Sequence, residues 1–506
     1  MRTAYSVETV RAAERELMAR LPEGALMQRA AAGLAVACGR LMGRVYGTRV
    51  VLLVGSGDNG GDALYAGARL ARRGAGVTAV LLAPERAHSG GLAALRGAGG
   101  TVVRAGGESG GGFGPGGGAG GGNGDLAWGE GRGGVTGVVR RADLVVDGIV
   151  GIGGRGGLRD DVLPLVAAVR ESGAAVVAVD LPSGVDADSG EVRGAAIRAD
   201  LTVTFGTHKP GLLVDPAREY AGTVRLVDIG LGAVLPEVAE LEALQHADVA
   251  RLLPVPGAES DKYRRGVVGI AAGSARYPGA AVLAVAGALR GGAGAVRYVG
   301  PAGDAVIARF PEALVSDQGP RAAGRVQAWV VGPGAGDDAG AVAEVLEADV
   351  PVLIDADGLR LAEREAVRGR RAPTLMTPHA GEAAALLGVA RAEVEGARLS
   401  AARELAARYG ATVLLKGSTT LVVGPAAGPV RVNPTGTPWL ATAGSGDVLS
   451  GLCGSLLAAG LSAVDAGSVG AYLHGLAGRL AAEGAPVGAQ GVAEGVGRAW
   501  RDVRGG

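Results

Sequence analysis

Short apolar runs alternate with longer helical segments along the first 230 residues. The runs are rich in β-branched residues and lack the alternation of polar and apolar positions that marks a strand with one solvated face. Continuous apolar strands separated by helices indicate a parallel sheet covered by helices on both faces. A leading helix is expected over Ser6–Leu21, with Ser6 as its cap. The predicted strands are Arg49–Val54, Val77–Leu82, Asp143–Asp147, Ala175–Asp180, Leu201–Phe205 and Val224–Asp228.

The same alternation resumes after residue 247. Ala-rich segments such as Ala280–Leu289 and Leu399–Tyr409 predict the helices of this part. We therefore expect an α/β protein of two domains, each a three-layer αβα sandwich around its own sheet. The predicted strands of the second domain are Val267–Ala271, Ala295–Val299, Ala328–Gly332, Val352–Asp355, Thr374–Thr377, Thr412–Lys416 and Thr420–Val423.

The domain boundary is predicted at a connector over residues 231–246. Residues 1–230 then form the first domain and residues 247–503 the second, and the acidic stretch Pro236–Leu244 is expected to be helical. Between Ala105 and Gly124 more than half of the residues are glycine. Such a composition cannot bury enough apolar surface to fix one conformation. We predict a disordered surface insertion rather than a phosphate loop, because the segment has no basic residue and no helix follows it.

Composition narrows the class of protein. The chain has 506 residues with 50 basic and 50 acidic side chains, so nothing in its charge favours nucleic acid or an anionic membrane as a partner. Two cysteines lie far apart in apolar segments, as buried thiols of a reducing compartment do. A signal peptide needs an uninterrupted apolar core near the N-terminus, and the charged residues at positions 14–16 interrupt it. No apolar run reaches the length of a membrane span. The expectation is a soluble, cytoplasmic protein.

Two segments of the second domain indicate nucleotide chemistry. Thr442–Asp447 is a glycine turn before an apolar helical segment, and such a turn leaves backbone N–H groups free to bind an anion. A carboxylate repels a phosphate, so Asp447 is better interpreted as a base that takes a proton from a hydroxyl. Lys416–Thr420 offers backbone and hydroxyl groups to a nucleotide. Alternatively, the same sequence forms an ordinary hairpin turn. Because 93 residues are glycine, no single glycine motif is informative alone.

Two more segments end predicted strands, where open α/β sheets bind ligands. Thr377–Glu382 contains His379 beside a proline and a glycine, which favours a ligand contact over a purely structural role. Gly332–Gly336 has glycines that allow a ligand close to the backbone.

As a set, these segments resemble the ribokinase-like superfamily and, more closely, the ADP- or ATP-dependent NAD(P)H-hydrate dehydratases. The resemblance runs from about Ala247 to Val503 and also includes Gly269–Ser274, Tyr277–Ala281 and Asp355–Asp357. It implies a ribokinase-like sandwich that uses ADP or ATP with Mg²⁺ to turn the ring hydroxyl of hydrated NADH or NADPH into a phosphate leaving group. Asp447 would be the base on that hydroxyl. The resemblance implies hydrate contacts at Ala280, Gly334, His379 and Asp447, and adenine-nucleotide contacts at Lys416, Gly417, Ser418, Thr419, Thr420 and Gly446.

In the first domain, the strand Arg49–Val54 runs into the glycine-rich turn Gly55–Asp62, with a helix expected over Ala63–Arg72. This turn again suits a phosphate, but it lacks the spacing of the dinucleotide fingerprint, and its carboxylates and Asn59 make it unusually polar. Further along, Asp147 and Ser183 also follow predicted strands. Together with Asn59 they could give hard oxygen ligands to a cation at one edge of the sheet. Alternatively, these residues only satisfy the backbone of local turns.

The first domain resembles the NAD(P)H-hydrate epimerases from about Met1 to Gly230, including Phe205–Gly211. The resemblance implies a Rossmann-like sandwich, with Ala63 in place of the usual glycine. Asp180 is the candidate proton shuttle between the two epimers. A potassium ion would be held by Asn59, Asp147 and Ser183. Hydrate contacts are implied at Asp58, Asn59, Gly60, Gly61, Asp62, Gly151, Ile152, Gly153, Gly154, Arg155, Gly156, Gly157 and Asp180.

The two halves together predict a bifunctional repair enzyme. One domain would interconvert the R and S forms of hydrated NADH or NADPH, and the other would dehydrate the S form at the expense of ADP or ATP. A ribokinase-like small-molecule kinase with an accessory N-terminal binding domain would use the same base but release a phosphorylated alcohol. A non-catalytic N-terminal module is a third reading. His379 and the N-terminal residues favour repair. We expect a homo-oligomer, although the Ala/Gly-rich helices suit a core as well as an interface.

Overall fold

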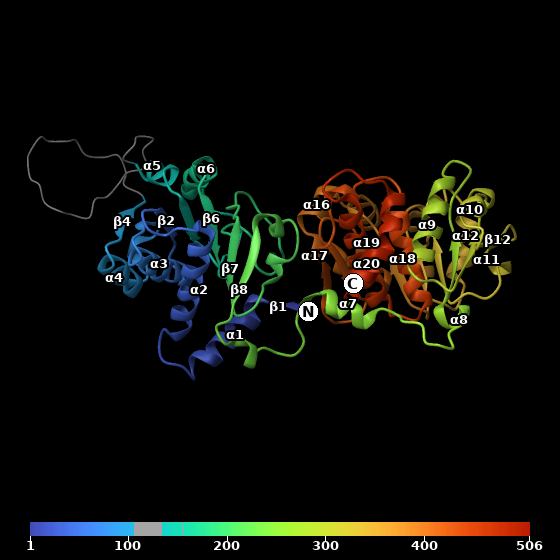
Figure 1. Cartoon of the computed structure of the whole chain (residues 1–506), viewed down its shortest axis with the longest axis horizontal. Coiled ribbons are helices and arrows are strands. Elements are labelled where there is room, and N and C mark those ends of the chain that lie inside the picture. The colour runs from blue at the N-terminus through green and yellow to red at the C-terminus, as the bar shows by residue number, and fades with distance from the viewer. Residues whose placement is uncertain (106–133, 155, 506) are drawn as a thin grey trace, which may run out of the picture. The chain divides into compact units, whose positions relative to one another are not determined.

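The computed structural model describes residues 1–105, 134–154 and 156–505 of the chain. The predicted insertion over residues 105–124 therefore lies, from residue 106 onward, outside the described residues. Backbone contacts divide the chain into two compact units (Figure 1), Ala4–Glu237 and Met1–Thr3 with Val238–Gly506. We call them the N-terminal and C-terminal units. Among the described residues, every helix is too short or too polar to cross a lipid bilayer.

The N-terminal unit is built on a seven-stranded parallel sheet. Strand order reverses direction between β2 and β5, which makes this pair the topological switch point where such sheets bind ligands. In spatial order the strands are β4 (Thr101–Arg104), β3 (Gly76–Leu81), β2 (Arg49–Val54), β5 (Leu144–Gly148), β6 (Ala175–Val179), β7 (Leu201–Phe205) and β8 (Thr223–Val227).

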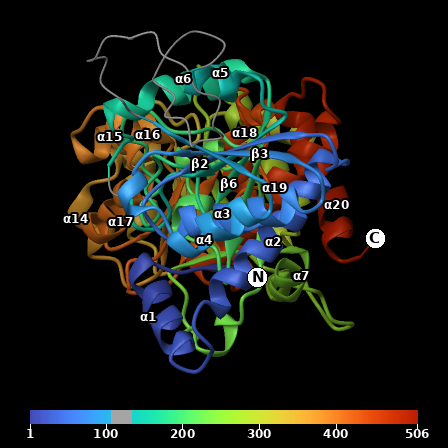
Figure 2. The same cartoon turned by 90° about the vertical axis from the view of Figure 1, so that its left-hand side faces the viewer.

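Helices cover both faces of this sheet. The neighbouring helices α2 (Ala25–Met42), α3 (Asp58–Ala71) and α4 (Ser89–Gly97) lie together on one face (Figure 2). On the other face, α5 (Val135–Arg140) and α6 (Leu163–Ser172) pack against apolar side chains of β2 and β5. The expected three-layer sandwich is thus present. The short α1 (Val7–Met18) begins where predicted, because the Ser6 side chain accepts a hydrogen bond from the Thr9 backbone N–H at 3.3 Å.

The prediction for α3 is wrong at its start. The helix was expected from Ala63, but it begins at Asp58, so residues 58–62 form its first turns rather than a free loop. Gly60 makes this possible, because the helix passes close to the backbone of the preceding turn there. A Cβ at Gly60 would lie 2.5 Å from the Gly55 carbonyl oxygen.

The C-terminal unit is built on an eleven-stranded mixed sheet. The strands from β12 to β16 run parallel, and β17 is antiparallel to both of its neighbours. In spatial order the strands are β1 (Arg2–Ala4), β9 (Leu241–Ala243), β18 (Val430–Asn433), β17 (Thr420–Val423), β16 (Thr412–Leu415), β15 (Thr374–Met376), β14 (Val352–Ile354), β13 (Ala328–Val331), β10 (Val267–Ala271), β11 (Ala295–Val299) and β12 (Leu314–Ser316).

The connector differs from the prediction. The helix expected over Pro236–Leu244 is absent, and β9 joins the sheet instead, because Leu241 and Ala243 are buried on either side of the less buried Glu242. Residues 1–3 also belong to this unit, through β1. Every strand predicted from an apolar run is present with ends shifted by at most one residue, whereas β1, β4, β9, β12 and β18 were not predicted.

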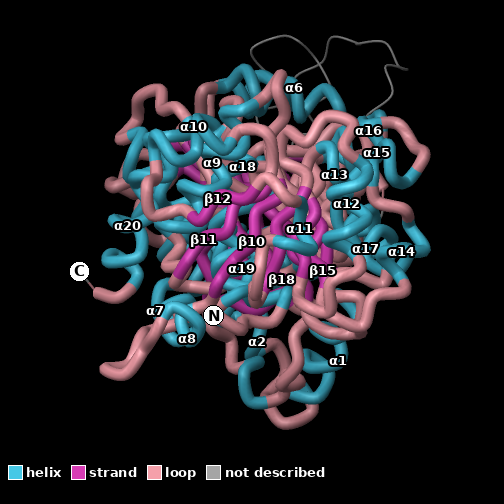
Figure 3. Tube along the Cα trace, turned by 90° about the vertical axis from the view of Figure 1, so that its right-hand side faces the viewer, coloured by secondary structure: helices cyan, strands magenta, loops and turns pink. Residues whose placement is uncertain are grey.

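Two groups of helices cover the C-terminal sheet. Figure 3 shows α9 and α20 on one side of the strands and α12, α13 and α17 on the other. The first group consists of α9 (Pro278–Arg290), α18 (Ser445–Ala458), α19 (Ala463–Ala482) and α20 (Ala489–Val503). The second consists of α12 (Ala339–Leu346), α13 (Asp357–Leu361), α15 (Ala380–Leu387) and α17 (Arg398–Tyr409). Shorter helices are α7 (His246–Leu252), α8 (Lys262–Arg265), α10 (Gly303–Arg309), α11 (Gly319–Ala322), α14 (Arg364–Arg368) and α16 (Arg391–Gly396).

The backbones of α9 and α18 approach unusually closely. A Cβ at Gly451 would lie 1.9 Å from the Ala284 carbonyl oxygen, and a Cβ at Gly287 would lie 2.1 Å from the Val448 carbonyl oxygen. Glycine is therefore required at both contacts. This packing fixes the position of α18, whose first turn carries the predicted base.

Candidate active sites

The predicted phosphate turn is the start of α18. Gly444 is the N-cap residue with φ +85°, a left-handed conformation that favours glycine, and a Cβ there would lie 2.3 Å from the Leu283 side chain. Ser445, Gly446 and Asp447 form the first helical turn. The Ser445 N–H donates to the Thr442 carbonyl at 3.3 Å, whereas the N–H groups of Gly446 and Asp447 make no backbone hydrogen bond, so they can bind an anion.

Asp447 shares the C-terminal edge of the sheet with a buried ion pair. Lys416 Nζ lies 2.7 Å from Asp355 Oδ1 and 3.7 Å from a Glu382 carboxylate oxygen. Burial and the neighbouring Asp355 raise the pKa of Asp447 to about 7, against the opposing charge of Lys416. A carboxylate with this pKa can take up a proton near neutral pH.

The predicted hydrate contacts of the C-terminal unit lie on neighbouring segments. Gly334 has φ +61°, and a Cβ there would lie 2.7 Å from the Ala280 Cβ, so these two predicted residues are adjacent. His379 caps α15, because its Nδ1 accepts hydrogen bonds from the backbone N–H groups of Gly381 and Glu382. Its side chain is still 59 % exposed. The histidine thus has a structural role as a helix cap, and its ring also remains accessible to a ligand.

Lys416–Thr420 forms the turn between the antiparallel strands β16 and β17, so the hairpin reading of its backbone is correct. Arg398 of α17 holds this turn by donating to the carbonyls of Leu415, Lys416 and Thr419. A Cβ at Gly417 would lie 2.3 Å from the Arg398 guanidinium. Arg398 therefore fixes the conformation of this turn, which lies at the same edge of the sheet as Asp447.

His474 is a buried residue of α19 beneath the phosphate turn that no sequence motif marks. Its Nε2 lies 2.9 Å from the Ser445 carbonyl oxygen and 3.3 Å from Ser445 Oγ. Burial lowers the pKa of His474 to about 4, so the ring is neutral at physiological pH and holds the turn as a hydrogen-bond donor. A lone histidine in an apolar helical segment gives no sequence signal for such a contact.

In the N-terminal unit, two of the three predicted cation ligands are in direct contact. Ser183 Oγ donates to Asp147 Oδ1 at 2.6 Å, and Ser183 N–H donates to Asp147 Oδ2 at 2.8 Å. The Asn59 amide group occupies the space where a Cβ at Gly151 would stand. Asp147 is fully buried, burial raises its pKa to about 6, and no Lys or Arg among the described residues pairs with it. A buried carboxylate with neutral oxygen donors beside it fits a monovalent cation.

Asp180 follows β6 with φ +67°, a strained conformation for a residue other than glycine. Its Oδ1 accepts three hydrogen bonds, from Lys209 Nζ at 2.5 Å, Thr204 Oγ1 at 2.9 Å and the Phe205 N–H at 3.3 Å. Lys209 is only 1 % exposed. Its segment, Phe205–Gly211, was noticed in the sequence, but the ion pair with Asp180 was not.

Asp62, in the first turns of α3, is 6 % exposed. Its Oδ1 is buried without a hydrogen-bond partner. Burial and the nearby carboxylates of Asp180, Asp58 and Glu14 raise its pKa, with Lys209 opposing. The predicted residues Asp58 and Asp62 thus lie in the same electrostatic neighbourhood as Asp180.

The predicted glycine loop over residues 151–157 borders a pocket of about 260 Å³. The pocket lies at the switch point of the sheet, and Gly154, Gly156 and Gly157 line it together with Gly55 and Arg86. Ile152 and Gly153 belong to the turn that the Gly154 N–H closes on the Gly151 carbonyl. Arg155 lies outside the described residues.

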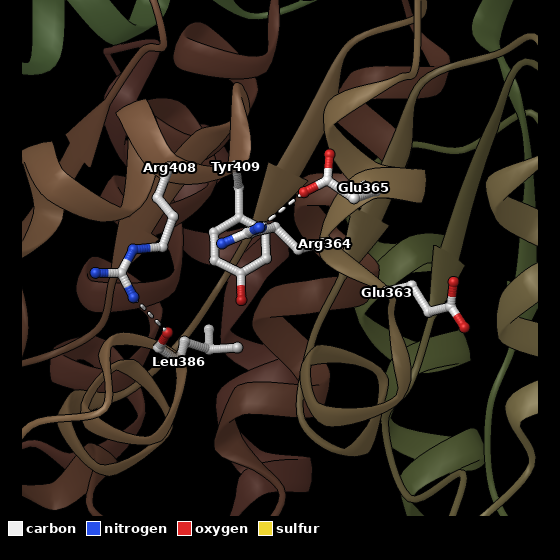
Figure 4. A pocket seen from close by; sticks show the side chains of 6 residues that line it. All are labelled: Glu363, Arg364, Glu365, Leu386, Arg408 and Tyr409. Atoms are coloured by element: carbon white, nitrogen blue, oxygen red, sulfur yellow. Dashed lines mark hydrogen bonds and ion pairs between the residues drawn. The ribbon is translucent and has the colours of Figure 1, made fainter.

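A pocket of about 340 Å³ in the C-terminal unit contains none of the predicted residues (Figure 4). It is lined by Glu363, Arg364, Glu365, Leu386, Arg408 and Tyr409. Tyr409 ends α17 just before β16 begins, so the pocket lies toward the N-terminal ends of the strands. The predicted catalytic groups of this unit lie at the opposite ends, which is where parallel sheets bind ligands.

The fold and the two sets of side chains are those of an α/β protein with one candidate active site in each unit. Residues 268–492 match the family model described as NAD(P)H-hydrate dehydratase, and residues 23–211 match that of the YjeF-related protein N-terminus. A bifunctional NAD(P)H-hydrate repair enzyme of Mycobacterium leprae is 48% identical over 95% of this chain and 94% of its own length. The enzyme of the same description from Mycobacterium tuberculosis is 49% identical over 92% of this chain and 91% of its own.

The chain therefore belongs to the family of bifunctional NAD(P)H-hydrate repair enzymes. The resemblance predicted from its motifs is confirmed. Among solved structures, an ADP/ATP-dependent NAD(P)H-hydrate dehydratase from Bacillus subtilis, co-crystallised with ATP and Mg²⁺, is 29% identical and covers 52% of this chain and 99% of its own, with a TM-score of 0.48.

Proposed function

We propose that the C-terminal unit dehydrates the S form of hydrated NADH or NADPH at the expense of ADP or ATP. Phosphoryl transfer to the ring hydroxyl turns a poor leaving group into phosphate, and Asp447 takes the hydroxyl proton. The observation that carries this role is the position of Asp447 in the first turn of α18, where its pKa is near 7. Backbone N–H groups of that turn stabilise the transferred phosphoryl charge.

Substrate and nucleotide are proposed to meet at this turn. Ala280, Gly334 and His379 would contact the hydrate, while Gly446 and the turn Lys416–Thr420 would contact the nucleotide. Mg²⁺ would neutralise the nucleotide phosphates, and Asp355 and Asp357, whose charges both act on Asp447, are acidic groups that could hold it. Lys416 is already paired with Asp355, which keeps its ammonium at the phosphate end of the site.

The N-terminal unit is proposed to interconvert the R and S forms, so that both reach the dehydratase. Asp180 would exchange a proton with the substrate, held in place by Lys209 and Thr204. Potassium would be bound by Asn59, Asp147 and Ser183, where it would supply positive charge at the switch point. The adjoining glycine loop and residues 58–62 would bind the hydrate.

We further propose a cytoplasmic homo-oligomer. Both cysteines, Cys38 and Cys453, are buried free thiols, as expected in a reducing compartment. Light scattering of the purified chain would measure its oligomeric state, and fractionation of cells that express it would measure its location.

The experiment that tests the function uses purified protein with chemically hydrated NADH. Recovery of dihydronicotinamide absorbance is followed without nucleotide, with ADP and with ATP. Nucleotide-dependent recovery that consumes both epimers is expected, and it identifies the phosphoryl donor. A phosphorylated alcohol released without NADH would instead establish the ribokinase-like kinase. Recovery limited to one epimer would leave the N-terminal unit without the proposed activity.

A further inference from the structure

The chemistry of the hydrate itself limits how its two forms can interconvert, provided that the proposed epimerase function holds. The dihydronicotinamide ring is an enamine, so protonation at the β-carbon directs water to the carbon bonded to the ring nitrogen. The hydrated carbon is thus a carbinolamine. The nitrogen lone pair can expel the hydroxyl to give an iminium ion, and water can then add to either face. Inversion needs a proton donor for the departing hydroxyl and a proton acceptor for the incoming water.

Asp180 has the features of the acceptor. The three hydrogen bonds that its side chain accepts from the described residues all go to Oδ1. Oδ2 makes none, so its lone pairs remain available to a ligand at the end of β6. The three hydrogen bonds hold the carboxylate in this orientation, and the backbone at φ +67° is strained, as it often is at active sites.

Asp62 has the complementary features of the donor. It is more than nine-tenths buried and its Oδ1 has no partner. Burial and the unpartnered Oδ1 favour the neutral acid, because an unpaired buried charge is costly. Three neighbouring carboxylates, those of Asp180, Asp58 and Glu14, favour the neutral form further. Asp62 thus differs from Asp180, whose Oδ1 accepts three hydrogen bonds.

Lys209 is not the donor. Its ammonium has three N–H groups, and all three are used, on Asp180 Oδ1, on Thr204 Oγ1 at 3.1 Å and on the Phe205 carbonyl oxygen at 3.2 Å. It is also 1 % exposed, so no group is left to reach a substrate. Its role is to position Asp180.

We propose that Asp62 and Asp180 form the donor–acceptor pair of an epimerase that works by water exchange. In one direction, Asp62 gives its proton to the hydroxyl, the C–O bond breaks, and the oxygen leaves as water. A second water attacks the opposite face of the iminium carbon, the new C–O bond forms, and this water gives a proton to Asp180. The other epimer is processed by the enzyme in the reverse protonation state, with Asp180 as donor and Asp62 as acceptor, so protons and oxygen atoms balance in both directions.

The first test follows the oxygen atom. The purified R form is incubated with the full-length protein in H₂¹⁸O without nucleotide, so that the dehydratase is idle, and the S form is analysed by mass spectrometry at early times. One ¹⁸O per enzymatic inversion is expected, after subtraction of the reaction without protein. Inversion that retains ¹⁶O would overturn the proposal, because it would show that the C–O bond survives.

The second test follows the donor. Asp62→Asn keeps the shape but cannot give a proton, so kcat for inversion should fall by about 100-fold or more, with KM changed only a few-fold. Asp62→Glu should recover part of kcat. The matched control is Glu171→Gln, a surface carboxylate of α6 that pairs with Arg140. Nucleotide-dependent dehydration of the S form by the same chains reports that they fold. An Asp62→Asn chain with wild-type kcat would overturn the proposal.

These outcomes separate the inference from the function on which it rests. If the wild-type chain does not accelerate inversion at all, the proposed epimerase function fails and this mechanism with it. If the wild type is active but ¹⁶O is retained or Asp62→Asn is fully active, only the mechanism fails.

Discussion

Replacing Asp447 should make the protein more stable and less active. Its folded pKa of about 7 lies above the usual value of 3.8, so folding favours the protonated form. This contribution to stability is complete below about pH 4 and is lost as the pH rises toward 7. Asp447→Asn should therefore raise the free energy of unfolding at pH 8 by roughly 1–3 kcal/mol, allowing for partial solvent screening. Urea denaturation at pH 8 and pH 4 measures this, and a stabilisation that does not shrink at pH 4 would contradict it.

The same substitution should lower dehydratase kcat by about 100-fold or more, because the amide cannot accept the hydroxyl proton. In the wild-type chain, kcat should rise with pH and level off above about pH 7, as Asp447 becomes ionised. A pH profile of S-form dehydration with saturating nucleotide tests both statements. A rate that is flat between pH 5.5 and pH 8 would show that Asp447 is not the base.

Functional residues could be predicted from the sequence only where they lie in a recognisable motif. Asp447, Asp62 and Asp180 stand in glycine-rich or strand-end segments, and they could be singled out. Lys209 and His474 could not be assigned, because their roles arise from contacts with Asp180 and Ser445 that only the fold creates. Arg398 is similar, since its support of the turn Lys416–Thr420 depends on the packing of α17.

At the scale of elements, the contact between α9 and α18 is the most sensitive part of the dehydratase. Gly451→Ala would place a methyl group 1.9 Å from the Ala284 carbonyl oxygen, so α18 must move. We expect a loss of ~3 kcal/mol in stability and a large loss of dehydratase activity, while R–S inversion persists.

The control for this prediction is Gly497→Ala on α20, where a Cβ meets only the flexible end of Arg501 at 3.8 Å. This change should stabilise the chain by about 0.5–1 kcal/mol, because alanine has the higher helix propensity. Thermal denaturation and both activity assays compare the two variants. Equal effects of Gly451→Ala and Gly497→Ala would mean that the close approach of the helices is not important.

Strands that are apolar throughout were predictable, whereas several short strands were not. The central strands of both sheets are apolar throughout, so their runs mark them directly. β9 has three residues with Glu242 in the middle, and its pairing with β18 decides its structure over an acidic sequence that favours a helix. The early start of α3 at Asp58 has a similar cause, since tertiary contacts of Gly60 override the weak helix propensity of glycine.

At the scale of the whole molecule, the two activities should respond separately to potassium. Replacing K⁺ by a large organic cation should slow R–S inversion at least 10-fold, because Asp147 would be buried without a counter-charge. Dehydration of the S form should continue, so recovery of NADH should stop once that form is consumed. Chiral analysis of the residual hydrate provides the measurement, with Na⁺ as an intermediate case. Complete consumption of both forms without K⁺ would argue against the cation site.

The family could be inferred from sequence because its motifs recur in a fixed order across two domains, although each motif is weak in so glycine-rich a chain. The oligomeric state could not be inferred in this way, since a small-residue helix face suits a core and an interface equally well. In the structure, glycines of α9 and α18 serve the core of the C-terminal unit.

The raised pKa of Asp447 has a consequence for a cell that becomes acidic. Enamine hydration starts with a proton, so the damaged coenzyme forms faster as the pH falls, by up to about tenfold per unit. Below pH 7 the ionised fraction of Asp447 falls by about the same factor per unit. The steady-state ratio of damaged to intact coenzyme should then grow with roughly the square of the proton concentration.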